Sequence, residues 1–113
     1  MIEFLFLLFV KHFVIDFIMQ TDAMVKGKGI YGNLSGILHS LQHGIGTLFV
    51  CVVCIAQPIY WVIIPLADMI LHYHIDYCKM RFGCRDVTQP KFWHQLGLDQ
   101  FLHYTCYLAF AAL

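Results

Sequence analysis

The sequence consists of four long apolar segments separated by two polar stretches and one short turn. The apolar segments cover residues 2–20, 34–56, 58–80 and 92–112. At about 1.5 Å of rise per residue, each is long enough to cross most or all of the roughly 30 Å hydrocarbon core of a bilayer. Polar stretches of 13 and 11 residues, "TDAMVKGKGIYGN" and "RFGCRDVTQPK", separate the first pair and the last pair. The pattern predicts an all-α membrane protein, in which residues 1–113 form a single domain of four transmembrane helices.

Polar residues recur at intervals of four within each apolar segment. The pairs are His12 and Asp16, His39 and His43, His72 and Asp76, and Asp99 and His103. Residues four apart share one face of a helix, so each predicted helix has a polar stripe. Measured from the helix ends next to the polar loops, all eight residues lie at depths of about 5 to 16 Å. We therefore expect the four stripes to meet in one layer of the bundle.

Ionisable side chains at this depth predict a metal site. An unpaired ionisable group in hydrocarbon is costly, so such groups turn inward and pair with one another or bind an ion. Imidazole and carboxylate ligands suit zinc or iron, and carboxylates also suit manganese. The predicted ligands of a divalent metal, zinc first, are His12, Asp16, His39, His43, His72, Asp76, Asp99 and His103. Asp16, Asp76 and Asp99 are also the candidate catalytic groups, each as a ligand or as a general base.

Composition and charge agree with a membrane location. Hydrophobic residues make up 60% of the chain and charged residues 12%, whereas a soluble domain is about half apolar and a quarter charged. The formal net charge is zero, which argues against a nucleic-acid partner. The bilayer is instead the expected partner, and the expected location is the bacterial inner membrane, crossed several times.

Basic residues predict the orientation of the chain. Six of the seven lie in or next to the two polar stretches: Lys26, Lys28, Lys79, Arg81, Arg85 and Lys91. The positive-inside rule therefore places both loops in the cytoplasm and both termini on the outer side. Lys11 is the exception, because it lies within a predicted span and must reach the interface or find a carboxylate.

The leading functional hypothesis is a metal-dependent hydrolase at the inner face of the membrane. A zinc ion would lower the pKa of a bound water to about 7. Basic residues at the mouth of the site, namely Lys26, Lys28, Arg81 and Arg85, would favour an anionic, lipid-like substrate. Lys79, Gln20 and Gln100 are the candidate substrate-binding residues.

This pattern does not establish enzymatic activity, and two other functions are compatible with it. A transporter or channel for metal ions or protons would use the same residues. An interaction protein, of phage or bacterial origin, would use the polar centre as structure only. A homo-oligomer is compatible with all three functions, and Gly44 and Gly46 would permit close helix packing.

The same residues carry a resemblance to a known family. The motifs are H-x3-D-F-x2-Q at 12–20, H-x3-H at 39–43, H-x3-D-x2-K at 72–79 and D-Q-x2-H at 99–103. In combination they resemble a family of small prokaryotic and phage membrane proteins known as a domain of unknown function. The resemblance implies a helical membrane protein with an ordered polar centre, and implies no activity or cofactor. The sequence is also similar, more loosely, to membrane-bound metal-dependent hydrolases. It lacks the His-Arg and Thr-His-Ser signature of those proteins.

Overall fold

The computed structural model describes residues 1–113, and all of its regular structure is helical. The elements are α1 (Ile2–Phe13), a π-helical turn (Val14–Ile18), α2 (Asp22–Lys28), α3 (Leu34–Cys54), α4 (Tyr60–Phe82) and α5 (Pro90–Ala111). The all-α class expected from the sequence is therefore confirmed, and the four long helices occupy the four apolar segments.

The structure differs from the expected helices and loops around residues 14–28. The helix expected over residues 2–20 changes from α to π geometry at Val14, where the Met19 N–H donates to the Val14 carbonyl at 2.9 Å. The stretch expected as a loop contains α2, which begins because the Thr21 hydroxyl accepts a hydrogen bond from the Met24 N–H at 3.2 Å. Both differences bring residues of this region towards the centre of the molecule.

Local signals explain where α3 and α5 begin. Asn33 caps α3 by accepting a hydrogen bond from the Ser35 N–H at 2.9 Å. Pro90 is the first residue of α5, a position that needs no donated N–H. Just before it, the backbone N–H and the hydroxyl of Thr88 both donate to Asp86, and these hydrogen bonds lower the pKa of the Asp86 carboxyl.

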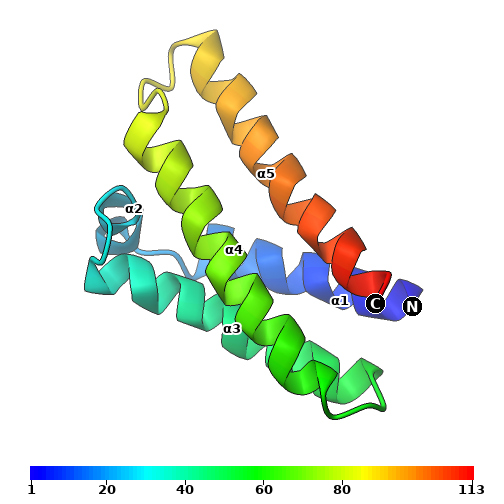
Figure 1. The fold of residues 1–113 in the computed structure, drawn as a ribbon. Helices are drawn as coiled ribbons and strands as arrows, with labels where there is room; N and C mark the ends of the chain where they lie inside the picture. The colour runs from blue at the N-terminus through cyan, green and yellow to red at the C-terminus, as the bar shows by residue number, and fades with distance from the viewer.

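The four long helices run back and forth between two ends of the molecule. Figure 1 shows both chain termini beside each other at one end, with the α3–α4 turn near them, and α2 and the α4–α5 loop at the other. We refer to these as the terminal end and the loop end. The longest dimension is 45 Å, and α3 packs most extensively against α4. This topology brings the inner faces of all four long helices together.

Burial in this protein is the reverse of that in a water-soluble domain. Thirteen buried residues are polar or charged, against eight that are hydrophobic. Large apolar side chains are exposed instead, including Phe6 at 63%, Phe49 at 68%, Ile70 at 54% and Phe101 at 64%, one on each long helix. The small hydrophobic core lies towards the terminal end and consists of Phe4, Leu8, Val50, Cys51, Ile64, Tyr107 and Phe110. The polar residues therefore form the middle of the bundle.

By length and composition, α3 is the one helix that could cross a membrane, with a mean hydropathy of 1.6. A helix in the core of a soluble protein can have the same length and hydropathy. Helix α1 has only 12 residues, and the polar stripes lower the hydropathy of α4 and α5. The four-span architecture and the location of the termini outside therefore stay predictions.

Candidate metal centre

The four polar stripes meet in one buried cluster. Every residue predicted as a metal ligand is at most 7% exposed: His12, Asp16, His39, His43, His72, Asp76, Asp99 and His103. They come from α1, the π-helical turn, α3, α4 and α5. The expectation that spacing and depth would bring them together is met by their positions, while their role as ligands stays a prediction.

Asp16 is the first of two carboxylates around which the histidines gather. Its Oδ1 lies 3.0 Å from His39 Nε2, 2.8 Å from His43 Nε2 and 3.5 Å from His72 Nε2. Its Oδ2 lies 3.1 Å from His12 Nε2. The π-helical turn carries Asp16, and single π turns within helices are frequent at functional sites.

Asp76 on α4 is the second such carboxylate. Its Oδ1 lies 3.2 Å from His103 Nε2, and its Oδ2 lies 3.2 Å from His72 Nε2 and 3.5 Å from His39 Nε2. The same Oδ2 lies 2.9 Å from Lys28 Nζ. His39 and His72 therefore lie between the two carboxylates.

The His72 side chain has no hydrogen bond on either ring nitrogen, although it is 1% exposed. Its ring is stacked between those of His43 and His103, with centroid distances of 3.5 and 4.0 Å. A buried polar atom without a partner is costly, and a native structure usually satisfies it with a protein group, water or an ion.

Two groups of side chains have the geometry to hold a cation. One ligand atom each from Asp16, His39, His43 and His72 lie within 4.8 Å of one another, and so do those of His72, Asp76 and His103. The groups share His72, so they are adjacent. Their nitrogen and oxygen donors fit zinc, iron or manganese, and the arrangement suits one or two ions.

A second polar network extends from this cluster towards the terminal end. Lys11 Nζ donates to Asp68 Oδ2 at 2.6 Å and to the Tyr107 hydroxyl at 3.1 Å, and it lies 3.2 Å from His43 Nδ1. The Thr47 hydroxyl donates to the same Asp68 oxygen at 2.5 Å. The carboxylate that Lys11 was expected to need is therefore Asp68.

Lys11 determines which nitrogen of His43 carries the proton. An ammonium group can only donate, so His43 Nδ1 accepts, and the proton of the neutral ring is on Nε2, where it points to Asp16. The Tyr107 hydroxyl likewise accepts from Lys11 and donates to His12 Nδ1 at 2.9 Å. His43 is then an N–H donor towards Asp16, whereas the Nε2 proton of His12 is directed at the Gln100 carbonyl oxygen, 2.9 Å away. Neither Nε2 lone pair is therefore free for a metal.

The residues predicted to bind substrate have different surroundings. Lys79 Nζ donates to Asp99 Oδ2 at 3.1 Å, and the Gln100 amide donates to the same oxygen at 3.1 Å. The Gln100 carbonyl oxygen lies 2.9 Å from His12 Nε2, whereas Asp99 Oδ1 is buried without a hydrogen bond. Gln20 donates to a backbone carbonyl of its own helix turn and stays outside the cluster.

The position of Lys28 differs from the one that the sequence predicts. It was assigned to the mouth of the site with Lys26, Arg81 and Arg85, which are indeed exposed. Lys28 is instead 5% exposed and ion-paired with Asp76. Lys28 is the last residue of α2 and lies between two glycines. Glycines allow close backbone packing, and they were the sequence signal available for the burial of this lysine.

Three further residues of the centre are not among the predicted ligands: Thr47, Asp68 and Tyr107. Thr47 and Asp68 were expected only as polar groups that a transport path could use. Each of the three lies four positions from a predicted ligand, Thr47 after His43, Asp68 before His72 and Tyr107 after His103. They continue the same helix stripes towards the terminal end, so the interval of four was again the signal.

Gly44 and Gly46 pack within the chain. A Cβ atom at Gly44 would lie 3.3 Å from Met69 Cβ, and one at Gly46 would lie 2.7 Å from Lys11 Cγ. The absence of a side chain at Gly46 therefore makes the space that the buried lysine occupies.

Comparison with known proteins gives one match. No curated protein and no solved structure matches the chain. Residues 4–113 match the family described as "Protein of unknown function (DUF3307)". The match covers nearly the whole sequence and includes every residue of the polar centre, so the chain belongs to this uncharacterised family.

Proposed function

We propose that this protein holds a divalent metal ion, zinc first, at the His/Asp centre of a membrane-embedded helical bundle. The observation that carries the proposal is His72, a buried imidazole without hydrogen bonds whose Nε2 lies 3.5 Å from Asp16 Oδ1 and 3.2 Å from Asp76 Oδ2. Iron or manganese would fit the same donors. A cation would satisfy His72 and explain why carboxylates and imidazoles converge from four helices.

The proposed ligands are fewer than the eight predicted residues. They are His39, His72, His103, Asp16 and Asp76, which include members of both groups with ligand geometry. His43 acts instead as an N–H donor that holds the Asp16 carboxylate in place, because Lys11 occupies its Nδ1. His12 donates to the Gln100 carbonyl oxygen, because Tyr107 occupies its Nδ1.

Charge balance supports a cation in the centre. The buried or partly buried charged groups are the carboxylates Asp16, Asp68, Asp76 and Asp99 and the ammonium groups Lys11, Lys28 and Lys79. With neutral imidazoles, these groups leave a formal charge of −1. A protonated His103, which lies between Asp76 and Asp99, or a divalent ion together with one hydroxide would bring the centre to zero, the least costly state for a buried cluster.

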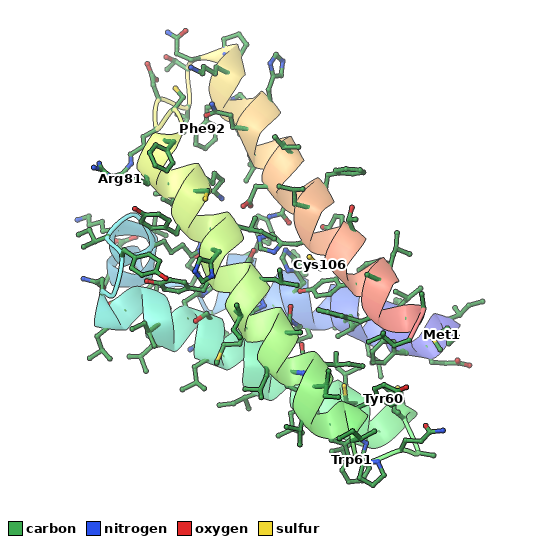
Figure 2. The ribbon with its side chains drawn as sticks, in the orientation of Figure 1. Met1, Tyr60, Trp61, Arg81, Phe92 and Cys106 are labelled. Atoms are coloured by element: carbon green, nitrogen blue, oxygen red, sulfur yellow. The ribbon has the colours of Figure 1, made fainter.

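The membrane part of the proposal rests on the outward-facing side chains. Apolar residues cover all four long helices, and such a surface is favourable in lipid and unfavourable in water. Tyr60 and Trp61 lie at the terminal end, while Arg81 extends from the loop end, as Figure 2 shows. Trp93 lies near that same loop. Aromatic residues at both ends and basic residues at one are typical of membrane proteins, with the loop end in the cytoplasm.

Hydrolysis is the chemistry that the centre supports best. The metal would supply a water of lowered pKa. Asp99 Oδ1 has no hydrogen bond and lies 3.5 Å from His103 Nε2, so it can take a proton from this water, while Lys79 and Gln100 hold its Oδ2. In the hydrolysis of a phosphate ester, this water would displace the ester oxygen from phosphorus, and Asp99 would pass the proton that it has taken to that leaving oxygen.

Transport of ions or protons is the second candidate, and one observation favours it. Polar contacts continue from Asp16 through His43 and Lys11 to Asp68, in the direction of the terminal end. Beyond Asp68, however, the hydrophobic core closes the bundle. A structural polar core in an interaction protein remains the third candidate.

Metal analysis of matched histidine variants tests the proposal. Wild-type protein, His72→Ala and His74→Ala are purified in detergent without chelator, and metal content is measured by mass spectrometry. His74 is the control because it is two residues away, exposed, and paired with Tyr31 and a backbone carbonyl. We expect about one or two ions per wild-type chain, the same in His74→Ala, and a large loss in His72→Ala.

Two results would overturn the metal proposal. One is wild-type protein that stays folded and takes up no zinc, iron or manganese when each is added, which would favour a structural core. The other is equal metal loss in both variants. Separately, extraction of the protein from membranes by alkaline carbonate would contradict the embedded bundle.

A further inference from the structure

Two cavities meet at Lys79, on the surface next to the buried centre. The first is a groove of about 440 Å³ between α4 and α5, within the size range of small-molecule sites. Its walls are apolar and include Leu71, Ile75, Leu98 and Leu102. Lys79 also lines this groove. We call it the α4–α5 groove.

The second cavity is a cleft of about 330 Å³ at the loop end, between α2 and the start of α5. Its lining includes Lys26, Lys79, Arg85 and Gln20, so three cations face one small space. We call it the basic cleft. Lys79 and Gln95 line both cavities, so the α4–α5 groove and the basic cleft are parts of one amphipathic depression.

The cations of the basic cleft have hydrogen-bond donors to spare. Lys79 is 23% exposed and gives one of its three N–H groups to Asp99. Arg85 uses Nε and Nη2 on the Met80 carbonyl, which leaves Nη1 free, and Lys26 is exposed. An anion with several acceptor oxygens, such as a phosphate monoester, matches this set better than a carboxylate.

We propose that the α4–α5 groove and the basic cleft together bind an amphiphile with a phosphate head group and one apolar chain. The chain lies along the apolar groove, and the phosphate contacts Lys79, Arg85 and Lys26. This inference rests on the proposed function in one respect: the head group at Lys79 is next to Asp99, the proposed base of the centre. It names a phosphorylated lipid as the class of substrate.

Binding, not turnover, tests this inference. Full-length protein in nanodiscs of phosphatidylcholine is titrated with farnesyl phosphate and followed by the ³¹P signal of the head group. Farnesol, which lacks the charge, and inorganic phosphate, which lacks the chain, are the comparison probes. We expect farnesyl phosphate to bind at least about tenfold more tightly than either.

Variants separate the two parts of the site. Lys79→Gln should weaken farnesyl phosphate binding by about tenfold or more, because a charge-assisted contact is lost. Lys91→Gln is its control, since Lys91 is exposed on α5 and lines neither cavity. Leu98→Trp should fill the groove and weaken farnesyl phosphate binding without changing that of inorganic phosphate.

Three outcomes would overturn the inference: equal affinity for farnesyl phosphate and inorganic phosphate, equal affinity for farnesol, or equal weakening by Lys79→Gln and Lys91→Gln. Failure of the metal proposal is distinguishable from these, because protein stripped of metal by a chelator should still bind farnesyl phosphate through Lys79. Dimers that disappear with Leu98→Trp, together with no lipid binding, would assign the groove to a second copy of the chain.

Discussion

Lys11 Nζ and Asp68 Oδ2 form a 2.6 Å ion pair in which both side chains are at most 6% exposed. Lys11→Met would leave the Asp68 charge buried without a cation, and we expect a loss of about 3 to 5 kcal/mol in the free energy of unfolding. The double variant Lys11→Met/Asp68→Leu should be more stable than Lys11→Met alone, because an apolar pair needs no charge compensation. Thermal unfolding in detergent, followed by circular dichroism, measures both, and additive losses would contradict this account.

The proton position on His43 gives a second prediction. ¹⁵N NMR of histidine-labelled protein should find the His43 proton on Nε2, since Lys11 occupies Nδ1. His43→Ala should therefore retain more metal than His39→Ala, although the two residues are four apart on the same helix. A proton on Nδ1, or greater metal loss in His43→Ala, would instead make His43 a ligand.

A third prediction concerns the close approach of α1 and α3 at Gly46. Gly46→Ala places a methyl group 2.7 Å from Lys11 Cγ and should cost about 1 to 3 kcal/mol of stability. Gly97→Ala on α5 is the control, because nothing lies within 4 Å of its added Cβ, and alanine favours helix there by about 1 kcal/mol. Unfolding temperatures should thus fall for the first variant and rise slightly for the second.

Lys28 gives a fourth prediction, on the attachment of α2. Lys28→Met removes the ion pair with Asp76, so hydrogen exchange of the α2 amides should accelerate and metal affinity should change. Lys26→Met, two residues earlier and exposed, should leave both unchanged. Equal exchange in the two variants would show that α2 is held by other contacts.

The fifth prediction separates the proposed base from the ligands. Asp99→Asn should retain metal and reduce hydrolysis of farnesyl phosphate by about 10² to 10⁴. Asp86→Asn is the control, because Asp86 lies exposed in the α4–α5 loop and its carboxylate accepts hydrogen bonds from Thr88, outside the centre. Loss of metal in Asp99→Asn would make Asp99 a ligand, and unchanged hydrolysis would remove it from the chemistry.

The long helices followed from the apolar segments, and the gathering of the histidines followed from the spacing of polar residues, because i and i+4 positions share a face whatever the packing. The similar depth of the four polar stripes, measured from the helix ends, predicted that they would meet at one level of the bundle. Which polar side chains pair with one another did not follow from the spacing. Asp68 lies on the same stripe as His72 and Asp76, yet only the packing of both α1 and α4 against α3 shows that it pairs with Lys11.

The region around α2 was the least predictable part. A basic residue in a polar loop is ordinarily a solvated charge, and Lys28 differs from Lys26 locally only in having a glycine on both sides. Their difference in burial arises because α2 folds back against the start of α3, a tertiary contact that no spacing encodes. The π-helical turn at Asp16 likewise has no distinguishing residue pattern.

The sequence separations of the polar contacts have a consequence for synthesis of the chain. Lys11 and His12 emerge from the ribosome first, but their partners Asp68 and Tyr107 follow 57 and 95 positions later. During elongation, α1 can meet α3 through Asp16 and His43, only 27 residues apart, before α4 and α5 exist. The side chains of α1 therefore complete their hydrogen bonds only when α5 has been made. Chains that stall before α4 would carry Lys11 without its carboxylate, and incompletely folded chains are prone to aggregate.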